Sequence, residues 1–132
     1  MSVWQIEPKT SVGPLSLDSS VEQVELVLGN SCDRFKRGDN PNEILAYDNQ
    51  GLHVETAGDG RTLAVTVFAP CRIALKGVEL LSREVSSVEQ ELRDAGLMFE
   101  RVDAGLWNAD LLVMLVEHEG RVDGVEVRRV PY

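Results

Sequence analysis

The two histidines and their acidic neighbours are the residues of this chain whose types best suit chemistry. His118 stands between two carboxylates, Glu117 and Glu119, which is an arrangement that suits a general base or part of a metal site. In a strand, however, successive side chains point to opposite faces, so both carboxylates would point away from the imidazole. Gly120 follows directly and indicates a turn. We therefore interpret this segment as a solvated strand end.

His53 lies in an alternating segment, Leu52-His-Val-Glu-Thr56, typical of a strand. The two imidazoles would approach only if their strands were neighbours, and two histidines without a third ligand make a poor zinc site. The serine pairs at 19–20 and 86–87 fit helix capping, since no histidine is close to them in sequence. We expect a chain without catalytic residues, metal ligands or cofactors.

The cysteines and tryptophans are few enough to be informative. Cys32 and Cys71 lack the CxxC spacing of redox and metal motifs, and we expect half-buried, reduced thiols, with a disulfide as the alternative. Aromatic residues make up only 5% of the chain, so Trp4 and Trp107 are each a core residue or an interface anchor. Trp107 lies in 105–108, which we interpret as a turn. The candidate partner-binding residues are Trp107, Glu117, His118, Glu119 and His53.

Charge and composition exclude several classes of function. The 132 residues include 22 acidic and 13 basic side chains, for a net charge of -9. This charge argues against nucleic-acid binding, which needs a concentrated basic surface, and favours a basic protein as partner. The hydrophobic share of 43% suffices for one core. No secretion signal and no apolar stretch of about 18 residues is visible, so we expect a cytoplasmic protein without membrane contact.

A repeated pentapeptide organises the chain. Ser19-Ser-Val-Glu-Gln23 recurs at 86–90, and Gly29 and Gly96 follow at the same offset. In each copy a serine stands three residues before a glutamate, which is the spacing of a helix capping box. Apolar residues at helical spacing follow both copies. The predicted buried stripes are Val21, Val24, Val27 and Leu28 in the first helix, and Val85, Val88, Leu92 and Ala95 in the second.

Three antiparallel strands are expected after each helix. They are 43–47, 52–56 and 63–68 in the first unit, and 98–103, 110–117 and 122–130 in the second. The polar stretch 31–43, with the basic cluster Arg34–Arg37, is predicted to be a loop. The predicted class is α+β: a single domain, 1–132, of two similar (β)αβββ units, about 3–70 and 72–130. One antiparallel sheet would carry both helices on one side and leave its other face open to a partner or to a second copy.

The first unit resembles a known repeat. Val12–Leu17, followed by Val21, Val24, Leu28 and Gly29, is similar to the helix-plus-meander repeat of the beta-lactamase-inhibitory-protein type and of BamE-like domains. The resemblance implies a protein without catalytic residues that acts on a protein partner through one face of its sheet. In type, a small, acidic, cytoplasmic protein of this build is similar to the immunity proteins that neutralise bacterial toxins.

We therefore expect a non-enzymatic protein-binding module, in the form of an immunity protein that occludes a basic toxin. The alternative is a small-ligand-binding or regulatory domain that uses the open sheet face. An enzyme built around His118 and Glu117 is the third hypothesis.

Overall fold

The computed structural model describes residues 2–132 and confirms the α+β class, with two helices and mainly antiparallel strands. The helices are α1 (Val21–Leu28) and α2 (Val85–Asp94). The strands before α2 are β1 (Trp4–Glu7), β2 (Ser11–Val12), β3 (Leu15–Ser16), β4 (Asp33–Lys36), β5 (Glu43–Tyr47), β6 (Leu52–Thr56), β7 (Thr62–Val67), β8 (Ile73–Leu75) and β9 (Val78–Glu79). After α2 come β10 (Glu100–Val102), β11 (Gly105–Asn108), β12 (Val113–His118) and β13 (Arg121–Arg128). A short 3₁₀ turn, η1 (Asp48–Gln50), joins β5 to β6.

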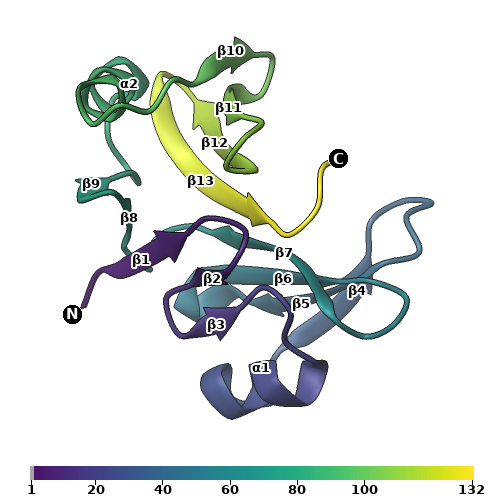
Figure 1. The fold of residues 1–132 in the computed structure, drawn as a ribbon. Helices are drawn as coiled ribbons and strands as arrows, with labels where there is room; N and C mark the ends of the chain where they lie inside the picture. The colour runs from purple at the N-terminus through teal and green to yellow at the C-terminus, as the bar shows by residue number, and fades with distance from the viewer. Residues whose placement is uncertain (1) are drawn as a thin grey trace.

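The strands form two sheets, so the prediction of one sheet is wrong (Figure 1). An eight-stranded sheet has the order β10-β11-β12-β13-β7-β6-β5-β4, and a five-stranded sheet has the order β3-β2-β1-β8-β9. The small sheet forms because the short segments before each helix pair with one another, through the parallel partners Trp4↔Ile73 and Gln5↔Ala74. These segments thereby supply a second apolar layer against the large sheet.

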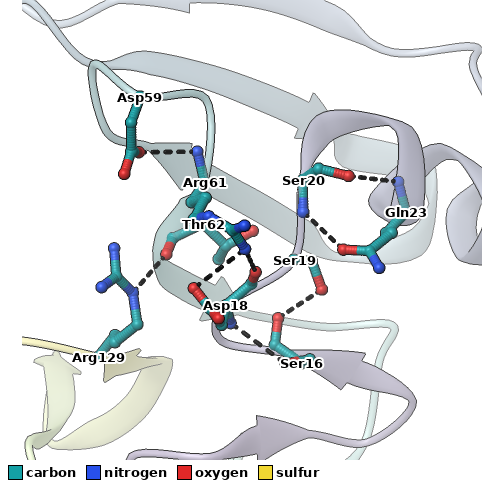
Figure 2. Close-up of polar contacts among 9 residues, drawn as sticks. All are labelled: Ser16, Asp18, Ser19, Ser20, Gln23, Asp59, Arg61, Thr62 and Arg129. Atoms are coloured by element: carbon teal, nitrogen blue, oxygen red, sulfur yellow. Dashed lines mark hydrogen bonds and ion pairs between the residues drawn. The ribbon is translucent and has the colours of Figure 1, made fainter.

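α1 begins with a capping box one residue later than the predicted Ser19–Glu22 box. The Ser20 hydroxyl accepts a hydrogen bond from the Gln23 amide, and the Gln23 side chain accepts one from the Ser20 amide (Figure 2). Val24 and Leu28 are buried as expected, whereas Val27 is 43% exposed. Gly29 ends the helix.

α2 begins earlier than predicted, and the Ser86 cap is wrong. Its N-cap is Glu84, whose side chain makes no capping hydrogen bond, and Val85 is the first helical residue. The amide of Val85 is satisfied by the carbonyl of Gly120 at 2.9 Å, so tertiary contact replaces the local cap. Val21 and Val88 are the corresponding valines of the two pentapeptides. Val21 is the first residue of α1, whereas Val88 is the fourth residue of α2, so the two pentapeptides occupy different positions in their helices. Within the predicted stripe, Val85, Val88 and Leu92 are buried and Ala95 is exposed.

Two strands were missed from the sequence. The predicted loop 31–43 contains β4, all four residues of which are exposed, so no buried alternation marks it. Trp107 lies in β11 and not in a turn. Gly105 suggested that turn, but a Cβ there would lie 2.0 Å from the Leu115 carbonyl oxygen, so the glycine allows β11 to approach β12 closely. β5 and β6 have the predicted bounds.

The core lies on one face of the eight-stranded sheet. Alternate residues of six strands form a cross-strand row in which every side chain is at most 2% exposed: Tyr47, Leu52, Val67, Val125, Leu115 and Leu106. Buried residues of α1, α2 and the five-stranded sheet belong to the same hydrophobic cluster. No helix among residues 2–132 is both long and apolar enough to cross a membrane.

The start of α1 is tied to the middle of the large sheet (Figure 2). The Thr62 amide, at the start of β7, donates to the Ser19 carbonyl at 2.7 Å, and Arg61 donates to the Asp18 carbonyl at 2.9 Å. Arg129, just after β13, donates its Nε to the Thr62 carbonyl at 2.9 Å. The helix entry and the two central strands are thus held at one point.

Two buried threonines at strand ends make a matched test of this packing. The hydroxyl of Thr62, 1% exposed, has no hydrogen-bond partner among the described residues, whereas the Thr56 hydroxyl donates to the Glu43 carbonyl at 3.0 Å. We predict that Thr62→Val raises the free energy of unfolding by about 1 kcal/mol, because an unpaired polar group leaves the core. Thr56→Val should lower it by about 1 kcal/mol. Urea unfolding of both variants measures this, and a loss of stability in both would contradict it.

Candidate functional site

The face of the eight-stranded sheet that points away from the core is the candidate site. Strand register places one residue from each of the eight strands in a single row across it. Because side chains alternate along a strand, this row lies opposite the buried one. In strand order from β4 to β10, the row is Asp33, Ala46, His53, Thr66, Glu126, Met114, Trp107 and Glu100. We call this surface the open face.

An aromatic cluster surrounds His53 at the β4 side of the open face. The His53 ring meets Phe35 and Phe68 edge-on, with centroids 5.9 and 5.1 Å away. Its Nε2 lies 2.6 Å from an Asp48 carboxylate oxygen, and its Nδ1 lies 3.2 Å from a guanidinium nitrogen of Arg37. Since an arginine can only donate, Nδ1 accepts and Nε2 donates to Asp48. Both ring nitrogens are therefore engaged, and the imidazole is held in one orientation.

A second aromatic cluster surrounds Trp107 on the other side of the open face. The Tyr132 ring lies 5.2 Å from the Trp107 ring between centroids, and the Arg128 guanidinium lies 4.1 Å from the Tyr132 centroid. Glu126 accepts hydrogen bonds from the Tyr132 hydroxyl and from Arg128. Partial burial, together with the hydrogen bond to Glu126, raises the pKa of Tyr132. Arg128 is only 7% exposed, so this ion pair is shielded from water.

Glu117, His118 and Glu119 do not join these clusters. The Glu117 carboxylate pairs with Arg101, which also reaches Glu89 of α2, so it lies on the helix side of the sheet. The His118 side chain is 71% exposed at the end of β12, beside an exposed Glu119. β6 and β12 are separated by β7 and β13, so His53 and His118 do not approach each other. Of the candidate residues, only His53 and Trp107 belong to the row across the open face, and His118 lies beyond the row at the end of β12.

A polar cavity of about 570 Å³ lies at the β4 edge of the sheet. It is lined by the end of α1, the turn η1 and the segment that contains Cys32 and Asp33. Burial and a hydrogen bond with Cys32 raise the pKa of Tyr47, whose hydroxyl donates to the Gly29 carbonyl. Cys32 and Cys71 are half-buried free thiols. Within residues 2–132, no group of three or more His, Cys, Asp or Glu side chains is placed to hold a metal ion.

Sequence reasoning missed most of the open face. Strand alternation carried a usable signal, because Glu126 and Arg128 alternate with the buried Val125 and Val127. The contribution of Tyr132 had no local signal, since its contacts depend on how the chain turns after β13. The residues missed are Phe35, Thr66, Phe68, Met114, Glu126, Arg128 and Tyr132.

Comparisons of the chain with protein-family models, curated protein sequences and solved structures gave no match.

The two histidines allow a matched test of the site geometry. We predict that His53→Ala lowers the free energy of unfolding by roughly 1–2 kcal/mol, because it removes two ring contacts and the partner of Asp48 and Arg37. His118→Ala should change it by less than about 0.5 kcal/mol, since an exposed side chain packs against little. Equal losses in urea unfolding would contradict this arrangement of the two residues.

Proposed function

We propose that this protein is a non-enzymatic binding module whose open face docks onto a basic protein. The observation that carries the proposal is the row of residues across all eight strands, with aromatic clusters around His53 and Trp107. Neighbouring strands lie about 4.8 Å apart, so eight strands make a surface about 34 Å wide. That width suits a standard protein interface, which buries about 800 Å² on each partner.

The composition of the open face supports a protein partner. Tryptophan, tyrosine and arginine dominate interface energetics when they lie in partly shielded positions. Trp107 and Arg128 lie on one side of the face, both against the Tyr132 ring, and Phe35 and Phe68 flank His53 on the other. Such side chains offer apolar contact area together with hydrogen-bonding groups.

The charge distribution supports a basic partner. Much of the positive charge is engaged within the chain, in pairs such as Arg72–Glu79 and Arg83–Glu91. The excess of acidic over basic residues, a net charge of -9, produces an acidic field that would steer a basic protein toward the surface. Neutralisation of a basic toxin in the cytoplasm, by an immunity protein, is the biological role we propose for it.

We further propose that two related units build the open face, about 3–70 and 72–130. Each helix entry pairs with the start of the last strand of its own half, through Ser20↔Arg61 and Glu84↔Arg121. In both halves the arginine also donates to a carbonyl before the helix, from Asp18 and Ser82 respectively. These matching contacts support the repeat better than the pentapeptide does.

One observation favours the alternative, a small-ligand-binding domain. The cavity of about 570 Å³ touches the open face at Asp33 and Ala46. A ligand held there would raise the unfolding temperature with little dependence on salt. A protein partner held by charge would instead be released as salt rises. A thermal-shift screen of metabolites at two salt concentrations separates the two functions.

The capture experiment uses the immobilised chain, a lysate of the organism that encodes it, and elution in salt steps. We predict that one basic protein is retained at one-to-one stoichiometry and that its affinity falls with salt. Trp107→Ala and His53→Ala should each weaken its binding at least about tenfold, because both remove anchors from the open face. His118→Ala is the matched control and should bind as the wild type does. The proposal would be contradicted if His118→Ala weakened binding as much as Trp107→Ala and His53→Ala do, or if the captured protein were retained equally at all salt concentrations.

A further inference from the structure

The residues that follow β13 cover part of the open face. Residues 130–132, which we call the tail, turn back over the Trp107 cluster. Tyr132 is the contact residue: its ring lies against Trp107 and Arg128, and its hydroxyl is bonded to Glu126. The Arg128 Nε also donates to the Val130 carbonyl at 3.0 Å. The tail therefore occupies the place beside Trp107 that a docked partner would need.

The attachment of the tail is weak compared with that of the strands. Arg129 is the last residue to enter the sheet, through its amide and the Leu63 carbonyl. Pro131 has no amide hydrogen to donate, so it cannot extend the ladder. Tyr132 is held by side-chain contacts while its surface stays 69% exposed. These contacts are few, and the conformational entropy lost on ordering the tail opposes them.

We propose that the tail is a displaceable cover that regulates access to Trp107. This inference rests on the proposed function, because the covered surface is the one assigned to the partner. In the attached state Tyr132 fills the space beside Trp107 and engages Glu126. In the released state Trp107 is uncovered and Glu126 keeps only its ion pair with Arg128, so docking on this side requires displacement of the tail. Removal of the Tyr132 ring should therefore strengthen partner binding.

The first test needs no partner. Trp4→Phe leaves Trp107 as the only tryptophan, and acrylamide quenching of its fluorescence then reports how well it is covered. Tyr132→Ala should raise the quenching constant and shift the emission to the red. Tyr132→Phe keeps the ring but loses the bond to Glu126, so its Trp107 should become exposed at a lower temperature than in the wild type. Phe35→Ala, in the distant cluster, is the control and should leave the quenching unchanged.

A temperature series decides between a cover and a fixed part of the fold. We expect wild-type quenching to rise to the Tyr132→Ala value well below the global unfolding transition. Protection that persists until global unfolding would overturn the proposal, as would identical quenching of Tyr132→Ala and the wild type. Far-ultraviolet circular dichroism on the same samples establishes where unfolding begins.

The capture experiment separates this inference from the proposed function. If Tyr132→Ala holds the captured protein to higher salt than the wild type does, both proposals are supported. If the wild type and Tyr132→Ala hold the partner to the same salt concentration, the proposed binding function is supported and the proposal of a displaceable cover is contradicted. If the tail opens on warming but the chain captures no partner, the displaceable tail is supported and the proposed binding function is contradicted.

Discussion

The antiparallel pairing of β7 with β13 is the contact on which the rest of the structure depends. It joins strands about sixty positions apart in sequence, through partners such as Val67↔Val125 and Ala64↔Arg128. Without it the large sheet would divide into two four-stranded pieces, and the row across the open face would break between Thr66 and Glu126. Arg129 reinforces the pairing, because it donates to carbonyls at both Thr62 and Leu63 of the first half.

The same pairing couples the core to the proposed binding surface. Val65 and Val127 face the helices and are fully buried, while their neighbours Thr66 and Glu126 face the other way. Because side chains alternate along a strand, the residues of one face pack in the core, while those of the other face form the proposed binding surface. The helices and the small sheet cover the first face, which leaves the second to the two aromatic clusters and the tail.

Local patterns in the sequence predicted the elements better than their assembly. The apolar spacing in α2 and the alternation in β6 identified those elements, because each buries one side against the core. The exposed strand β4 carries no such pattern, and Gly105 suggested a turn where it allows close strand approach. The parallel contact of β1 with β8 depends on residues far apart in sequence, which no local pattern encodes. His53 and Trp107 were identified by residue type, whereas Glu126, Arg128 and Tyr132 become a cluster only through tertiary structure.

The most direct test of this account is solvent paramagnetic relaxation of methyl groups in the free protein, with a soluble gadolinium chelate. We expect strong relaxation of the Thr66 and Met114 methyls, on the open face, and weak relaxation of the Val65 and Leu115 methyls, one residue away on the core face. A one-residue slip in strand register would exchange the two faces. Strong relaxation of Val65 and Leu115, or equal protection of all four, would contradict an open face built on the β7–β13 pairing.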